Sequence, residues 1–294
     1  MSIHSTGLSR ILQILEQPRR PGAPRTLPQI APQTMNSDKL TKSAVLKGDR
    51  FASDAGLNAV GAGQTTLGQG AVGPSVKAVQ QAFVDMAFLI PGGVDGMYGP
   101  QTAQSVRNFQ QMAGLPQTGV VDQATMKALD RYAPPAGKQS WDTGVNPGPL
   151  PDPRVGKKIA RVVVETQQHR AFLFDKTGKL TKIYACRSGK TSTPTVPGVK
   201  IVDGKNDNPA AVSNALWPTS GGRAFGTRLM NLSDYDPETG RTYLGPHHGE
   251  ELHGTYEDNS MGQNFSHGCV GLRNADIEEI YNQVANGELV RFDG

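Results

Sequence analysis

The chain has 294 residues, with 36% hydrophobic and 6% aromatic side chains, and it carries 35 glycines and 21 prolines. This length accommodates two modest domains, and the low apolar content predicts solvated stretches beside compact ones. The net charge of +4 suits binding to an anionic polymer surface. The sequence contains no run of basic residues interleaved with aromatics, the pattern that would predict nucleic-acid binding.

The N-terminal residues predict neither a membrane span nor an ordinary leader. No stretch approaches the roughly 20 apolar residues that cross a bilayer. The apolar stretch at residues 8–15 is interrupted by Arg10 and Gln13. A signal peptide needs a longer apolar core and a small-residue cleavage site, so we expect only a small amphipathic helix here.

Residues 1–65 are expected to form a disordered N-terminal segment. The stretch 17–25 is rich in proline and arginine, and glycines are frequent between residues 56 and 70. Such a composition buries too little apolar surface to offset the entropy of the chain. The segment is interpreted as a flexible lead, with a secretion address or a tether as the alternatives.

Residues 66–133 predict a small domain of three helices. Apolar residues recur at helical spacing in three runs: Val76, Val79, Phe83 and Met86; Val106, Phe109 and Ala113; Met126, Leu129 and Tyr132. Pro100 stands where proline is favoured, in the first turn of the second helix, and Gly114 stands at the end of that helix.

The two halves of this domain repeat one another. Residues 95–102 and 118–125 carry glycine and threonine at the same places, with a constant offset of 23 residues. This pattern is similar to the three-helix peptidoglycan-binding domain, and the resemblance implies binding of glycan strands or stem peptides. The alternative is a helical spacer whose apolar residues only form a core.

A linker and a second domain follow. Residues 134–157 contain six prolines and predict a semi-extended linker, in which Trp141 either docks on a domain or is exposed by chance. Residues 158–294 change to the period of strands. The predicted strands are residues 161–165, 170–174, 181–187, 199–202, 227–232 and 288–292. A late helix is predicted to begin at Asn274 as its cap, to bury Ile277, Ile280, Tyr281 and Val284, and to end at Gly287.

The expected fold class is therefore multidomain α+β. A small three-helix N-terminal domain precedes a mainly β sandwich or barrel with a late helix.

The most informative segment lies near the C-terminus. Glu251-Leu-His253-Gly-Thr255 is followed by Ser266-His-Gly-Cys269, which brings two histidines close in sequence to one of only two cysteines. A cysteine beside imidazoles is the residue set for thiolate nucleophilic catalysis, because a base must take the thiol proton and return it to the leaving amine. Two alternatives are a zinc site with three ligands and an inert structural cysteine.

The second cysteine offers a further alternative. Cys186 lies in the predicted strand 181–187. A disulfide with Cys269 would silence the nucleophile. We expect instead that Cys186 is a small packed side chain, since free cysteines are often buried.

The segment His253-Gly-Thr255, with Ser266-His-Gly-Cys269-Val-x-Leu-Arg273-Asn, resembles the L,D-transpeptidase (YkuD-type) catalytic domain. The Gly/Thr/Pro-rich stretch 188–198 and the residues that follow Asn274 extend this resemblance, which covers residues 157–294 approximately. It implies a β sandwich with the cysteine at one end. Gly271 departs from the pattern, because many relatives carry arginine or asparagine there.

The resemblance implies roles for the motif residues. Cys269 would be the nucleophile and His253 the general base, oriented by the backbone carbonyl of Gly254. Backbone amides of His267, Gly268 and Cys269 would stabilise the oxyanion.

Four further residues are candidates for substrate binding. Arg273 would hold a substrate carboxylate or, equally, pair with Asp276. Ser266, Tyr256 and Trp217 are weaker candidates.

The implied reaction is acyl transfer on peptidoglycan stem peptides through a thioester on Cys269, giving 3→3 cross-links. No cofactor and no metal is expected. The alternatives are an L,D-carboxypeptidase, a secreted toxin directed at a rival's wall with the same cysteine, and a wall-binding module with an inactive second domain. The substrate lies in the periplasm or cell wall, so we expect export by an unrecognised route.

Overall fold

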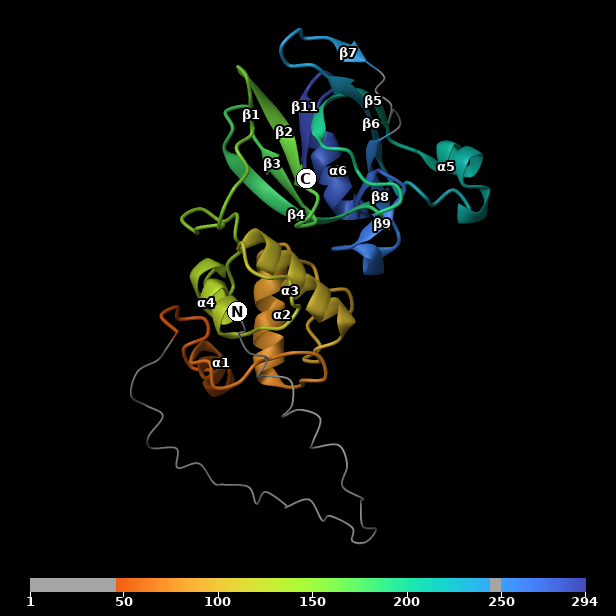
Figure 1. The fold of residues 1–294 in the computed structure, drawn as a ribbon. Coiled ribbons are helices and arrows are strands. Elements are labelled where there is room, and N and C mark those ends of the chain that lie inside the picture. Colours follow the sequence, from red (N-terminus) through yellow and green to blue (C-terminus); the bar gives the residue numbers. More distant parts are fainter. Residues whose placement is uncertain (1–45, 244–249) are drawn as a thin grey trace, which may run out of the picture. The chain divides into compact units, whose positions relative to one another are not determined.

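The computed structural model describes residues 46–243 and 250–294, and Figure 1 shows its ribbon. The expected disorder of residues 1–45 and the small helix at residues 8–15 therefore lie outside the described residues. No helix in the described part is both long enough and apolar enough to cross a bilayer.

Four helices of the described residues belong to the N-terminal domain, one more than predicted. They are α1 (Ala55–Gly61), α2 (Pro74–Asp85), α3 (Pro100–Met112) and α4 (Gln123–Tyr132). The expectation of disorder is wrong for residues 46–65, which include α1. Leu46, Phe51 and Leu57 of this segment are buried in the core of the domain. A few well-placed apolar residues are thus enough to order a glycine-rich stretch, because they complete a core that the other helices begin.

A buried glutamine on α2 organises the loop that leads into α3. The Nε2 atom of Gln80 lies within hydrogen-bonding distance of three acceptors: Asp95 Oδ1 at 2.8 Å, the Met97 carbonyl at 3.1 Å and Thr102 Oγ1 at 3.2 Å. The side-chain oxygen of Gln80, Oε1, accepts a hydrogen bond from the Gly96 amide at 2.8 Å. Gly96 has a φ of 79°, a conformation that glycine adopts without a steric penalty. One buried side chain therefore satisfies several polar groups of this turn.

The same arrangement recurs between α3 and α4. Gln110 Nε2 lies 3.0 Å from each of Thr118 Oγ1, the Val120 carbonyl and Thr125 Oγ1. The Gly119 amide donates to Gln110 Oε1 at 2.9 Å, and Gly119 has a φ of 71°. The predicted repeat is confirmed, and the structure adds its organising residues, which are the two glutamines.

The C-terminal domain is a β-barrel with a helix packed on its sheet (Figure 1). Its main strands are β2 (Lys158–Glu165), β3 (Arg170–Phe174), β4 (Leu180–Gly189), β5 (Gly198–Asn206), β6 (Leu229–Tyr235), β8 (Glu251–Thr255), β10 (Val270–Arg273) and β11 (Leu289–Asp293). They pair in the order β2-β11-β5-β6-β8-β10-β4-β3, and β3 pairs again with β2, which closes the barrel.

Shorter elements extend the barrel. Three short strands lie beside longer ones: β1 (Arg154–Val155) on β2, β7 (Thr242–Tyr243) on β6 and β9 (Asn264–Ser266) on β4. Helix α5 (Ala210–Leu216) and the 3₁₀ turn η2 (Pro218–Ser220) lie between β5 and β6, and the 3₁₀ turn η3 (Asp258–Ser260) follows β8. Each strand predicted from the sequence lies in or overlaps a strand of the barrel.

Helix α6 (Asn274–Gln283) packs on β6, β8 and β10. Ile277 and Ile280 are fully buried, as predicted, and Val284 is 1% exposed. The prediction that Asn274 caps this helix is wrong. Asn274 is the first helical residue, and its Oδ1 accepts from the Thr227 amide at 3.0 Å. A longer-range contact therefore uses the side chain that sequence reasoning assigned to a local role.

The proline-rich linker is partly ordered against the barrel. Its last residues form β1, which pairs with the start of β2. Trp141 is half-buried and packs against the apolar cluster that contains Phe172 and Ile183. The docked alternative for Trp141 is therefore confirmed.

Replacing Gln110 by leucine should lower the free energy of unfolding by about 2–4 kcal/mol, because the buried Gly119 amide and Val120 carbonyl lose their partner. Gln101→Leu is the matched control, since Gln101 lies on the same helix but is exposed, and its effect should stay within about 0.5 kcal/mol. Urea unfolding measures both, and equal effects would contradict the role of Gln110.

Candidate active site

Three neighbouring strands place the reactive residues on one face of the sheet. β8 and β10 pair in parallel with His253 opposite Gly271, and β10 and β4 pair antiparallel with Gly271 opposite Arg187. Paired residues point to the same face, so Arg187, Gly271 and His253 form one row across the sheet. Cys269 comes two residues before Gly271 and shares its face. Leu272 points to the opposite face and joins the core under α6.

Arg187, His253 and Cys269 line an open cleft of about 580 Å³. Its wall opposite the sheet comes from the segment between α5 and β6, which contributes Trp217 and Phe225. Six of the predicted site residues line the cleft: Trp217, His253, Tyr256, Ser266, His267 and Cys269. The structure therefore brings together the residues on which the catalytic hypothesis depends.

His253 is held in one orientation by its own strand and by an aromatic ring. Its Nδ1 lies 2.6 Å from the Gly254 carbonyl, as the resemblance implied. A carbonyl only accepts, so Nδ1 carries the hydrogen and Nε2 keeps its lone pair. The Phe225 ring packs edge-on against the imidazole, with the centroids 5.1 Å apart.

Burial decides the charge of His253. The side chain is 3% exposed, and this burial lowers the pKa of His253 to about 4, against the opposing effect of the Gly254 carbonyl and with a further lowering by Arg187. The imidazole is therefore neutral at pH 7 and can accept a proton.

Gly254 is required by close packing as well as by its carbonyl. A Cβ at this position would stand 2.4 Å from Asn274 Oδ1 and 3.1 Å from Ile277 Cγ2. Any larger residue would push β8 away from α6, so the glycine keeps the base on its strand.

The Cys269 thiol is half-buried and stands beside a carboxyl group. Cys269 Sγ lies 3.6 Å from Glu251 Oε2. Burial, with the Glu251 charge as a further cause, raises the pKa of the Cys269 thiol to about 12. Burial likewise raises the pKa of Glu251 to about 7, although the contact with the thiol opposes this rise. The thiol therefore rests protonated in the cleft that the neutral imidazole of His253 also lines.

The loop before Cys269 is braced from within. Ser266 Oγ donates to the Cys269 carbonyl and accepts from the Gly268 amide at 3.2 Å. Gly268 has a φ of 120°, which disfavours any side chain there. Ser266, predicted to bind substrate, thus holds the loop, and the Gly268 amide, predicted as an oxyanion donor, already has an acceptor.

A cluster of charged side chains around the buried Lys200 also supports the loop before Cys269. Lys200 Nζ lies 2.7 Å from both Asp234 Oδ1 and Glu250 Oε2, and its side chain is 3% exposed. Burial opposes the lysine charge, but the two carboxylates outweigh it and raise the pKa of Lys200. Glu250 also accepts from the Val196 amide at 2.7 Å.

Thr195 connects this ion cluster to the loop that carries Cys269. Next to Val196, Thr195 Oγ1 donates to the Gly268 carbonyl at 2.7 Å and accepts from the Gly189 amide at 2.8 Å. The segment 188–198, rich in glycine, threonine and proline, therefore positions residues 266–269.

The remaining predicted residues divide into two groups. His267 stacks on Trp217 with centroids 4.9 Å apart, and its Nε2 lies 3.0 Å from Lys190 Nζ. Tyr256 is 50% exposed at the cleft, and the Arg223 guanidinium lies 4.6 Å from the centroid of its ring. These side chains are placed to contact a ligand.

Arg273 does not line the cleft. It pairs with Asp276, with Arg273 Nε 2.8 Å from Asp276 Oδ2, and the two residues line a separate pocket. The prediction that Arg273 holds a substrate carboxylate is therefore not supported, and its structural alternative is. The reason is position: Arg273 ends β10 and begins the turn into α6.

Two alternatives for the cysteine can be compared with the structure. No disulfide joins Cys186 to Cys269, and Cys186 is buried in the core under α6, as expected. Among the described residues, no three histidine, cysteine or acidic side chains lie together as metal ligands.

Sequence reasoning missed Arg187, Phe225 and the ion cluster of Lys200. These residues are far from the motif in sequence, and only strand register brings them to it. Glu251 begins the motif, but nothing in the sequence placed its carboxyl group next to sulfur.

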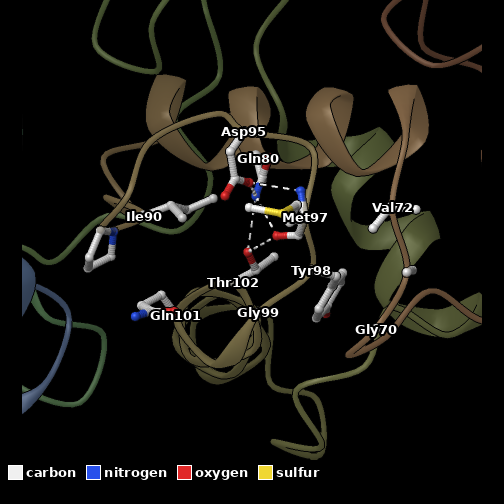
Figure 2. Close-up of a pocket in the computed structure, with 12 residues that line it drawn as sticks. Gly70, Val72, Gln80, Ile90, Asp95, Met97, Tyr98, Gly99, Gln101 and Thr102 are labelled. Atoms are coloured by element: carbon white, nitrogen blue, oxygen red, sulfur yellow. Dashed lines mark hydrogen bonds between the residues drawn. The ribbon is translucent and has the colours of Figure 1, made fainter.

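The N-terminal domain has a pocket of its own, of about 380 Å³ (Figure 2). The hydrogen-bonded group of Gln80, Asp95 and Thr102 lies within it, and Met97 lies beside this group. Met97 and Val72 are 58% and 75% exposed, which is unusual for large apolar side chains. The pocket thus combines a fixed polar floor with an apolar rim.

Comparison with known families gives a match for each domain. Residues 72–129 match the family described as "Putative peptidoglycan binding domain", and residues 159–291 match the "L,D-transpeptidase catalytic domain".

Two curated proteins illustrate the similarity. The chain is 36% identical over 88 residues to N-acetylmuramoyl-L-alanine amidase CwlL of Bacillus licheniformis, covering 30% of this chain and 24% of the amidase. It is 27% identical over 150 residues to "Putative L,D-transpeptidase YqjB" of Bacillus subtilis (strain 168), covering 51% of this chain and 76% of the relative. The chain thus spans only about a quarter of the amidase but most of the second relative.

A solved structure is also similar. The L,D-transpeptidase from Xylanimonas cellulosilytica is 23% identical, with a TM-score of 0.43, and the match covers 77% of this chain and 96% of that one.

Replacing Glu251 by glutamine should lower the pKa of the Cys269 thiol, because it removes a carboxylate 3.6 Å from the sulfur. Alkylation by iodoacetamide at pH 8 should then accelerate by roughly tenfold for each pH unit that the thiol pKa falls. Cys269→Ala reports the background from the buried Cys186. An unchanged or slower rate in Glu251→Gln would show that the carboxylate does not control the thiol.

Replacing Lys200 by methionine should destabilise the protein by about 3–5 kcal/mol, because the buried Glu250 and the partly buried Asp234 would lose their counter-charge. Lys182→Met is the control, since Lys182 pairs with Glu279 at a site where both side chains are about one-third exposed, and its effect should be below about 1 kcal/mol. Urea unfolding compares them, and similar losses would argue against a supporting role for the cluster.

Proposed function

Because residues 159–291 belong to the L,D-transpeptidase catalytic-domain family and follow a peptidoglycan-binding domain, we propose that this protein cross-links peptidoglycan by acyl transfer through Cys269. The acyl donor is a stem peptide that ends in D-alanine. The acceptor is the side-chain amine of a neighbouring stem, and the product is a 3→3 cross-link.

One observation carries the proposal. Cys269 and His253 open into the same cleft from one face of two adjacent parallel strands, and the Gly254 carbonyl fixes the imidazole with Nε2 available. A half-buried thiol with a neutral, oriented base is the arrangement that nucleophilic acyl transfer requires.

The first step forms the thioester. His253 Nε2 takes the thiol proton as Cys269 Sγ attacks the carbonyl carbon of the third stem residue. Because both groups are neutral at rest, the thiolate develops during attack instead of being stored. The tetrahedral intermediate collapses when the C–N bond to D-alanine breaks. The leaving nitrogen takes the proton back from His253, and an acyl-thioester remains.

The second step transfers the acyl group. The acceptor amine attacks the thioester carbonyl and loses a proton to His253, and the C–S bond breaks with return of that proton to sulfur. An amide forms and the thiol is regenerated, so atoms and charges balance without a cofactor. If water attacks instead, the same steps give a carboxypeptidase.

The oxyanion of both intermediates would be stabilised by backbone amides of residues 267–269. The Gly268 amide now donates to Ser266 Oγ at 3.2 Å, so this hydrogen bond must exchange for one to the oxyanion. An amide donor of this kind contributes typically about 3 kcal/mol to lowering the barrier. Thr195 holds the Gly268 carbonyl at 2.7 Å and restricts the loop during the exchange.

The N-terminal domain would hold the enzyme on its polymer. We assign glycan or stem-peptide binding to the pocket of Figure 2, because the polar groups of Asp95 and Gln101 line it together with the exposed Val72 and Met97. Sugars are bound in this way, through fixed hydrogen bonds beside apolar surface. The polymer lies outside the cytoplasm, so the protein would act in the periplasm or cell wall.

Incubation with purified tetrapeptide muropeptides tests this function by mass spectrometry. The wild type should release D-alanine, carry an acyl adduct on Cys269 and form 3→3 dimers. Cys269→Ala and His253→Gln should each lower turnover by roughly 10³-fold or more, whereas Cys186→Ala should retain it.

The outcomes separate the alternatives. Turnover that persists in Cys269→Ala would refute the cysteine mechanism, and loss of turnover with a chelator would favour zinc. Release of D-alanine without dimers would identify water as the acceptor. Absence of any turnover in the wild type would favour a wall-binding role.

A further inference from the structure

The Arg187 side chain lies across the floor of the cleft, in the space that a side chain at Gly271 would otherwise fill. It stands opposite Gly271 on the neighbouring strand. A Cβ at Gly271 would lie only 2.5 Å from Arg187 Nε and 2.9 Å from its Cγ. The arginine therefore lies directly over the glycine. Because His253 is the next residue in the same row, the glycine is all that separates the guanidinium stem from the base.

The guanidinium is fixed but only partly used. Its side chain is 7% exposed, and within residues 46–243 and 250–294 it hydrogen-bonds through Nη1, to Glu257 Oε2 at 2.5 Å and to Ser260 Oγ at 3.0 Å. The Phe265 ring covers it, with Cζ 5.3 Å from the ring centroid. Nε is buried and finds no acceptor among the described residues. A buried donor without an acceptor is costly, and a guanidinium offers five donors.

The Glu257 carboxylate already forms an ion pair with Arg187. The Glu257 side chain is 60% exposed, although it contacts a nearly buried partner. An exposed acid on a buried guanidinium is easily exchanged, because its own carboxylate is well solvated when released. Glu257 thus shows that Arg187 binds a carboxylate. Releasing Glu257 from Arg187 costs little free energy.

We propose that Arg187 binds the terminal α-carboxylate of the acyl donor, in exchange for Glu257, and so selects stem peptides that end in a free acid. This inference rests on the proposed transpeptidase function. It makes Arg187 a specificity-determining residue for the donor.

The chemistry of the leaving group explains the location. In the departing D-alanine, the amine nitrogen and the carboxylate carbon are both bonded to one Cα and lie ~2.5 Å apart. The base that protonates this nitrogen must therefore stand close to the group that binds the carboxylate. Arg187 and His253 meet this condition, since they share a row with only Gly271 between them.

The other arginines are less well placed. Arg223 lines the cleft, but it is exposed and lies over Tyr256. Arg273 lies in another pocket with Asp276. Among the arginines of the described cleft lining, Arg187 is the one whose position burial and strand pairing fix, and a fixed guanidinium recognises a carboxylate with little loss of entropy.

Peptide binding in a Cys269→Ala background tests the proposal without turnover. Isothermal titration calorimetry compares a stem tetrapeptide that ends in free D-alanine with the same peptide ending in its amide. The protein should bind the free acid roughly tenfold or more tightly. Adding Arg187→Gln should remove this preference by weakening acid binding alone. Arg223→Gln is the matched control, because it removes a cation from the same cleft and should keep the preference.

A second variant tests the exchange if Arg187→Gln fails to fold, which thermal melting reports. Glu257→Gln removes the competing carboxylate and should strengthen binding of the free acid severalfold, with little change for the amide. Asp258→Asn removes a charge from the adjacent exposed residue and should change neither.

The proposal is overturned if acid and amide bind equally to the protein that retains Arg187. It is also overturned if the folded Arg187→Gln variant keeps the preference, or if Glu257→Gln binds the acid no better than Asp258→Asn does. These results concern binding, whereas failure of the proposed function would appear as absence of Cys269-dependent turnover in the wild type.

Discussion

The parallel pairing of β8 with β10 is the constraint on which the site depends. It sets His253 opposite Gly271 and therefore fixes where Cys269 stands relative to the base. A shift of one residue would turn His253 into the core under α6 and Leu252 into the cleft. Gly254 allows the close approach of Asn274 on α6, and Gly268 allows the positive φ of 120° in the loop before Cys269.

Charge buried behind the loop protects that geometry. Lys200 between Asp234 and Glu250 is strongly attracted to both, and such a cluster tolerates little displacement because a separated buried charge is costly. Thr195 Oγ1 donates a hydrogen bond to the Gly268 carbonyl and so links the loop to this cluster. The loop that carries Cys269 is therefore held on one side by the ion cluster and on the other by Ser266, while its cleft side stays open.

Local patterns were sufficient to predict the helices α2 to α4, the strands and the cysteine–histidine motif, because apolar periodicity and short spacing are local properties. They failed where distant contacts decide. Asn274 accepts a hydrogen bond from the Thr227 amide instead of capping its own helix, and residues 46–65 complete a core that the other helices begin. Arg187 carried no signal, because only strand pairing reveals that it fills the space above Gly271.

The carboxyl group beside Cys269 has a consequence for chemical damage. Peroxides and disulfides attack the thiolate, and susceptibility to oxidation follows the fraction of thiol that is ionised. Burial and Glu251 keep that fraction low by raising the thiol pKa to about 12. Under oxidising conditions such a sulfur would persist as the thiol, and under the proposed function it would react only when a bound substrate offers it a carbonyl.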